Sequence, residues 1–163
     1  MASGFSFDIV SDFDQQELRN AIDQAQREIT TRYDLKDSKT EIEQEKDQLV
    51  ISTSDEFTLK SVTDILDTRV LRRGLSLKIL DYQTVQDASG GRVRQVVKLR
   101  RGIPEQLAKQ LVKEIRTEHK KVTPQIQGDA IRVTSKNKDD LQEVIQSLKS
   151  ADLDVALQFI NYR

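Results

Sequence analysis

Polar side chains that could bind an anionic ligand alternate along the segment Val122–Ser135. The segment reads VTPQIQGDAIRVTS, and its Gly128-Asp129 pair predicts a tight hairpin turn, because glycine readily takes the positive φ that such turns require. A two-residue turn would set Gln125 opposite Arg132 and, since side chains alternate across a strand, would gather the polar groups on one face. These groups are Thr123, Gln125, Gln127, Arg132 and Thr134. They predict an anion-binding face, although a solvated sheet surface would show the same pattern.

The other face of the predicted hairpin carries Pro124, Ile126, Ile131 and Val133, which we expect in a core. Lys136 follows at the start of a predicted helix, where unpaired backbone N–H groups favour anions.

Basic side chains also alternate along a long predicted strand, residues 92–101. Such a row suits phosphate contacts. It is also typical of an edge strand that charges protect from further pairing, and this is the position that we expect. The predicted nucleotide-binding residues are Gln125, Gln127, Arg132, Thr134, Lys136, Arg94, Lys98 and Arg100.

Charge is distributed unevenly along the 163 residues. Residues 1–68 hold 7 basic and 16 acidic residues, a net charge of −9, whereas residues 69–138 hold 17 and 6, a net charge of +11. Residues 139–163 carry −3, with 2 basic and 5 acidic residues. The middle segment is either an anion-binding surface or the complement of the acidic part within the fold.

The sequence gives little support for catalysis. It contains no cysteine and a single histidine, His119, which argues against zinc sites and nucleophile–histidine systems. It contains none of the common phosphate-loop, dinucleotide-binding or zinc-protease motifs. We therefore expect a protein that binds without catalysis and needs no metal or cofactor. An N-terminus without a signal-peptide pattern, and no apolar run of 18 residues, predict a cytoplasmic protein without membrane contact.

Hydrophobic periodicity predicts four helices. They begin near Asp14, Ser54, Pro104 and Asn137, and the first carries an apolar stripe at Leu18, Ala21, Ile22, Ala25 and Ile29. The predicted strands are residues 5–10, 40–45, 48–53, 75–80, 82–87, 92–101, 122–127, 130–135 and 155–162.

The order of these elements is strand, helix, two strands, helix, strand, and then the same again. Residues 49–66 align with residues 131–148 without a gap, with apolar positions coinciding, which indicates an internal duplication. Each half is therefore a βαββαβ unit. We expect an α+β protein of two tandem ferredoxin-like sandwiches, residues 1–87 (acidic) and 88–163 (basic), with antiparallel sheets and helices on one face. The long strand 92–101 leaves room for a strand exchange between the halves.

The sequence resembles the YajQ family of bacterial proteins over nearly its whole length. The resemblance rests on SFDIVS (6–11), DQQELRNAID (14–23), LRRG (71–74) and QIQGDAIRVTSKNKDDLQ (125–142), although Ser135 stands where glycine is expected. It implies tandem RNP-like domains that bind a nucleotide, with cyclic di-GMP as a ligand of some members. It also implies a role with nucleic acid, inferred from the fold.

RNA-binding modules of this kind stack bases on aromatic residues of their central strands. Strands 48–53 and 130–135 carry no aromatic residue, so we do not expect stacking. The first hairpin presents Glu41, Glu43 and Glu45 outward, which would repel phosphate. We therefore expect an anionic nucleotide, such as cyclic di-GMP or GTP, to bind through the second half. The alternatives are an RNA-binding protein and a protein-interaction module.

Overall fold

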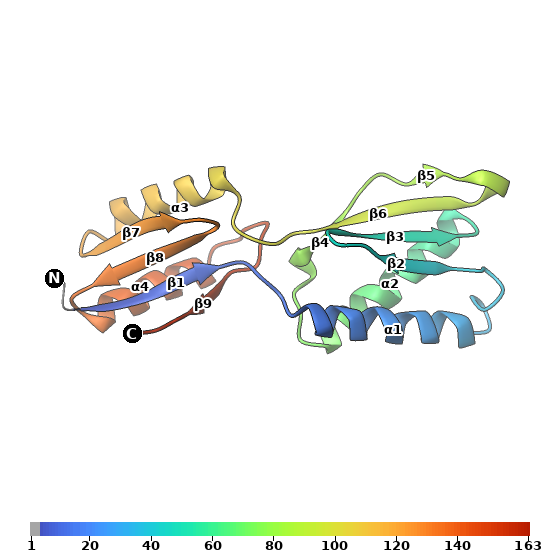
Figure 1. Cartoon of the computed structure of the whole chain (residues 1–163), viewed down its shortest axis with the longest axis horizontal. Coiled ribbons are helices and arrows are strands. Elements are labelled where there is room, and N and C mark those ends of the chain that lie inside the picture. Colours follow the sequence, from blue (N-terminus) through green and yellow to red (C-terminus); the bar gives the residue numbers. More distant parts are fainter. Residues whose placement is uncertain (1–3) are drawn as a thin grey trace. The chain divides into compact units, whose positions relative to one another are not determined.

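The computed structural model describes residues 4–163, which divide into two compact units (Figure 1). The central unit is residues 13–100, and the terminal unit is residues 4–12 together with 101–163. Each unit has its own sheet and its own hydrophobic core.

The terminal unit contains the two ends of the described chain. Its elements are β1 (Phe5–Val10), α3 (Glu105–Glu118), β7 (Val122–Gln127), β8 (Ala130–Ser135), α4 (Lys138–Lys149) and β9 (Gln158–Ile160). The strand order is β7-β8-β1-β9, and every pair is antiparallel. Helices α3 and α4 cover one face of this sheet, and their buried side chains pack on Phe7, Ile9, Ile131 and Val133 (Figure 1).

The central unit repeats this plan. Its elements are α1 (Gln15–Thr31), β2 (Glu41–Gln44), β3 (Gln48–Thr53), α2 (Glu56–Arg72), β4 (Leu80–Tyr82), β5 (Gln86–Asp87) and β6 (Val93–Leu99), with 3-10 turns at Leu77–Ile79 and Ser89–Gly91. The strand order is β2-β3-β6-β4, and β5 also pairs with β6. The fold is thus the predicted α+β tandem of two ferredoxin-like units.

The strand that begins each βαββαβ unit is exchanged between the halves of the sequence. Strand β1 pairs with β8 and β9, whereas β6 pairs with β3 and β4. The boundary predicted between residues 87 and 88 differs from the structure for this reason, because the units divide after Asp12 and after Arg100. The edge position predicted for residues 92–101 is also wrong, since β6 lies between two strands.

Local signals explain the smaller differences. Helix α2 is capped by the Asp55 carboxylate, which accepts from the Thr58 amide at 2.7 Å, one residue later than the predicted cap at Ser54. The predicted strand 75–80 begins only at Leu80, because the Ser76 side chain accepts from the Lys78 amide and starts a 3-10 turn. The stripe predicted for α1 is buried at all five positions.

The charge asymmetry of the sequence disappears within the units. The central unit holds 15 basic and 16 acidic residues, and the terminal unit, which has none in residues 1–3, holds 11 of each. Ion pairs join the two kinds of segment, such as Arg69 with Glu28 at 2.8 Å and Arg73 with Glu17 at 2.7 Å. Of the two readings of the sequence, the structure favours internal complementarity, so a binding site must be sought in local geometry rather than in net charge.

Candidate functional site

The hairpin β7–β8 has the predicted register. Gln125 is opposite Arg132 and Pro124 is opposite Val133, around a turn in which Gly128 has φ 63°. The uncovered face of the terminal sheet carries Thr123, Gln125, Gln127, Arg132 and Thr134, as predicted. The core position predicted for Ile126 is wrong, because this residue lies near the end of the hairpin and keeps 39% of its surface exposed.

Arg132 is engaged by a partner that the sequence pattern did not indicate. Its Nε and Nη2 donate to the two carboxylate oxygens of Asp8 on β1, at 2.9 and 3.3 Å. Asn161 donates to the same carboxylate at 2.8 Å. The Arg132 guanidinium, and then the Asn161 amide, hold the pKa of Asp8 below its ordinary value against the opposing effect of burial. Two of the guanidinium nitrogens therefore form hydrogen bonds between strands of the sheet.

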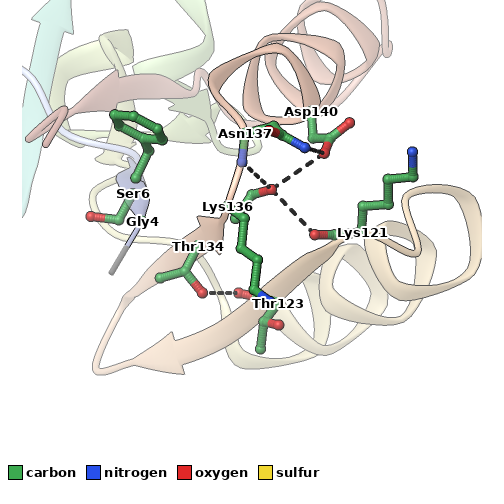
Figure 2. A pocket seen from close by; sticks show the side chains of 10 residues that line it. Gly4, Ser6, Lys121, Thr123, Thr134, Lys136, Asn137 and Asp140 are labelled. Atoms are coloured by element: carbon green, nitrogen blue, oxygen red, sulfur yellow. Dashed lines mark hydrogen bonds between the residues drawn. The ribbon is translucent and has the colours of Figure 1, made fainter. Parts of the chain in front are cut away.

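A hollow of about 720 Å³ lies where the uncovered face meets the start of α4 (Figure 2). Ser6, Thr123 and Thr134 contribute one wall from three neighbouring strands, and Ser6 is paired with Thr134 and Thr134 with Thr123. The remaining lining residues are Gly4, Phe5, Lys121, Ser135, Lys136, Asn137 and Asp140. Only two of the eight predicted residues, Thr134 and Lys136, line it.

Ser135 ties the elements around the hollow together. Its hydroxyl lies 3.2 Å from the Lys121 carbonyl and 3.4 Å from the Asp140 carboxylate, and it accepts from the Asn137 amide at 3.2 Å (Figure 2). It thereby connects the end of β8, the residue before β7 and the start of α4. The hydroxyl at this position, where the sequence pattern leads one to expect glycine, fixes the loop geometry.

Gly4 permits the close approach of β1 to β8 beside the hollow. A Cβ atom at this position would lie 2.7 Å from the Ser135 carbonyl oxygen, which is closer than real Cβ contacts. The absence of a side chain therefore matters here for packing rather than for a positive φ.

Two exposed lysines supply positive charge to the hollow. Among residues 4–163, neither Lys121 nor Lys136 has an ion-pair partner for its ammonium group. Lys138, the first residue of α4, instead holds its ammonium 4.9 Å from the centre of the Phe5 ring. The hollow therefore combines two available cations with hydroxyl groups and an aromatic edge, a set that suits a small anionic ligand.

At the corresponding place in the central unit, side chains form hydrogen bonds that the terminal unit lacks. The register pairs Val93 with Thr53, as it pairs Phe5 with Ser135, so Arg92 corresponds to Gly4. The Arg92 guanidinium donates to the carbonyls of Ser38 and Lys39, at 3.0 and 2.7 Å. The hydroxyls of Thr40 and Thr53 are hydrogen-bonded to each other at 2.8 Å. The duplicated units thus differ most plainly at this position.

The other predicted cations belong to the central unit. Arg94 donates to Gln86 at 3.1 Å, and Lys98 is paired in register with Asp81. Arg100 forms an ion pair with Asp81 at 3.3 Å. The structure therefore does not gather the eight predicted residues in one unit, because β6 contributes its cations to a face that Glu41 and Glu43 share.

In the part of the chain that the structure describes, no group of three or more histidine, cysteine or acidic side chains could hold a metal ion. No described helix has both the length and the apolar character needed to cross a membrane.

Comparison with known proteins gives one family over almost the whole chain. The family model described as nucleotide-binding protein YajQ-like matches residues 5–163. A nucleotide-binding protein of Synechococcus sp. strain JA-3-3Ab is 61% identical over 163 residues, and so is one of Thermosynechococcus vestitus. One of Acaryochloris marina is 60% identical. In all three cases the match covers 100% of both chains.

Proposed function

The chain belongs to the YajQ-like family of nucleotide-binding proteins, and we propose on this premise that it binds a nucleotide in the hollow of the terminal unit. Its relatives in Synechococcus and Thermosynechococcus are named for nucleotide binding, and they match the whole chain.

The observation that carries this proposal is the difference between the duplicated units. The hollow lies beside Gly4, which has no side chain, whereas at the corresponding place in the central unit the Arg92 guanidinium and the Thr40–Thr53 hydroxyl pair form hydrogen bonds. A fold that was duplicated needs the same packing in both copies. The volume of the hollow, about 720 Å³, falls within the range of small-molecule sites.

The lining residues suggest how each part of a nucleotide is held. Lys136 would neutralise phosphate oxygens, since a lysine ammonium suits phosphate as a compact point charge, and Lys121 would add positive charge on the other side of Ser135 (Figure 2). The hydroxyls of Ser6, Thr123 and Thr134 would bond to phosphate or ribose. The next row of the sheet, Gln125 with Arg132, extends the site, and Gln127 lies one row further along β7.

We propose a guanine nucleotide, GTP or cyclic di-GMP, as the ligand, and a binding role without catalysis or cofactor in the cytoplasm. Contacts of Arg94, Lys98 and Arg100 with the nucleotide stay a prediction. RNA is the second candidate, because Arg132 lies on the uncovered face and Lys121 and Lys136 lie beside it. An RNA site predicts an affinity that falls steeply with salt concentration.

Isothermal titration of the whole chain with GTP, cyclic di-GMP and a short single-stranded RNA tests the proposal. We expect the double variant Lys121→Ala/Lys136→Ala to weaken nucleotide binding by about tenfold or more, since each charge-assisted hydrogen bond contributes roughly 1.5–3 kcal/mol. Lys149→Ala, at the other end of α4, is the matched control and should bind normally. Absence of binding to every probe at near-physiological salt would contradict the proposal.

A further inference from the structure

One lining residue does not suit a hollow for anions. Asp140 is the one carboxylate among the ten residues that line it, and its charge would repel phosphate. It is half-buried, and α4 fixes it in its first turn, next to the buried Leu141. Its hydrogen-bond donors within the protein are the Ser135 hydroxyl and the Asn137 side-chain nitrogen.

Capping of α4 does not account for Asp140. In the central unit the helix is capped by the carboxylate of Asp55, at the cap position, and the residue that corresponds to Asp140 is Thr58. In the terminal unit the cap position is Asn137, whose side chain makes no capping bond. The carboxylate at this position is therefore a feature of the terminal unit and not of the duplicated fold, whose other copy has its first-turn acid at Glu56.

The Asp140 carboxylate has room for a stronger donor. One of its oxygens lies 3.4 Å from both the Ser135 hydroxyl and the Asn137 side-chain nitrogen, which is long for a hydrogen bond to a charged group. In Figure 2 the other oxygen takes part in no drawn hydrogen bond. Both oxygens can therefore accept from a ligand that offers two adjacent N–H groups.

Among the common bases, only guanine presents such a pair. Its N1–H and its 2-amino group point the same way and match the two oxygens of a carboxylate. Adenine and cytosine offer one amino group beside an acceptor, and uracil offers one ring N–H between two acceptors. Adenine and uracil would place acceptor atoms against the charged oxygens.

We propose that Asp140 is the base-selecting residue of the hollow and accepts both Watson–Crick-edge donors of guanine. This assignment rests on the proposed function. It orients the ligand, because the Lys136 side chain runs toward Thr123 and away from Asp140 (Figure 2). The base lies at the start of α4, and the phosphates lie along Lys136, away from the carboxylate.

Competition titrations with four nucleoside triphosphates test the assignment. The whole chain should bind GTP about 10-fold to 100-fold more tightly than ATP, as expected for a bidentate contact to a base. It should also prefer GTP to ITP, which lacks only the 2-amino group. Asp140→Asn should remove the preference for GTP over ITP. The variant should favour XTP, because the new amide donates to the 2-oxo group of xanthine.

Asp139→Asn is the matched control, since Asp139 is exposed in the same helical turn and does not line the hollow. Its preference for GTP should be unchanged. Equal binding of GTP, ITP and ATP by the unaltered chain, or an unchanged GTP preference in Asp140→Asn, would overturn the role of Asp140 and leave the proposed function standing. Binding of none of the four would overturn the assignment, and a further failure to bind cyclic di-GMP would overturn the proposed function as well. The comparison of GTP with ITP needs no variant, so it can overturn the assignment even if Asp140→Asn unfolds.

Discussion

Individual residues in this protein take their roles from partners that lie far away in the sequence. Arg132 was predicted as a ligand contact because it stands in a polar row, but its strongest contact is Asp8, 124 residues earlier. Strand pairing determines this neighbour, and an isolated hairpin pattern contains no information about β1. The polar row itself could be predicted, because the turn fixes the register of β7 with β8.

The Asp8–Arg132 pair should make stability depend on pH at the acidic end. The pKa of Asp8 is lowered in the fold by Arg132 and then by Asn161. Its stabilising contribution is therefore present above about pH 4, where the unfolded carboxyl ionises, and is lost as the pH falls through the lower folded value. Urea denaturation between pH 2 and 6 should show a steeper loss of stability in the unaltered chain than in Asp8→Asn. Equal slopes would contradict this.

The Asp67 carboxyl should have the opposite effect on the pH dependence of stability. Burial raises the pKa of Asp67 on α2, and its carboxylate accepts from the Tyr82 hydroxyl at 2.5 Å. The folded state therefore holds the proton more tightly than the unfolded state. The contribution of Asp67 is greatest below about pH 4 and falls as the pH rises through the folded value.

We expect Asp67→Asn, which keeps an acceptor for Tyr82, to be more stable than the unaltered chain at pH 7 and to lose this advantage near pH 3. Thermal melting at the two pH values measures this difference. A variant that is less stable at pH 7 would show that the ionised carboxylate is the favoured form in the fold.

Gly4 provides a test of the hollow at the level of one methyl group. A Cβ atom at residue 4 would meet the Ser135 carbonyl, so Gly4→Ala should destabilise the fold by about 1–3 kcal/mol, as other overpacked sites do. Since the hollow is formed at this strand contact, nucleotide affinity should fall as well. Denaturation and titration of the same variant measure both effects. An unchanged nucleotide affinity would mean that the binding site does not include the contact between β1 and β8.

At the scale of elements, long periodic segments were predictable and short ones were not. The stripe of α1 and the hairpin β7–β8 follow from patterns within 20 residues. Residues 75–80 alternate like a strand, yet Leu77–Ile79 form a 3-10 turn, in which the Ser76 side chain accepts from the Lys78 amide. The last strand, β9, is shorter than predicted for a different reason, because only Gln158–Ile160 pairs with β1.

The hairpin β7–β8 offers a pair of matched substitutions. Ile131 and Ile126 face each other in register, but Ile131 is fully buried, whereas Ile126 is 39% exposed. Ile131→Ala should cost about 2–5 kcal/mol of unfolding free energy, as is usual for a large-to-small change in a core. Ile126→Ala should cost clearly less. Urea denaturation of both variants checks the difference. Equal losses of unfolding free energy would mean that Ile126 contributes to the core as much as Ile131 does.

At the scale of the whole molecule, the fold class was predictable and the boundary was not. The duplication reveals two βαββαβ units, but the element order is the same whether each first strand stays in its own half or joins the other. The hollow was missed for a related reason, since Gly4, Lys121 and Asp140 come together only when β1 pairs with β8. The nearest signal in the sequence was Lys136, at the start of a predicted helix.

The exchange of strands makes a prediction about fragments. Residues 13–100 are continuous and contain every residue of the central core, including Val93 and Val97 on β6. A fragment 13–100 should therefore fold alone and unfold cooperatively. A fragment 1–87 lacks β6, the strand between β3 and β4, and would expose Leu49 and Ile51 along an open sheet. It should be unfolded or aggregated.

Circular dichroism melting and amide dispersion in NMR spectra distinguish the two fragments. The fragment 13–100 should also fail to bind GTP, because the hollow belongs to the terminal unit. A cooperative transition in fragment 1–87 would mean that the first half can complete its own sheet with β1. The exchange would then be one of two arrangements open to the duplicated sequence, and not the only one that its packing allows.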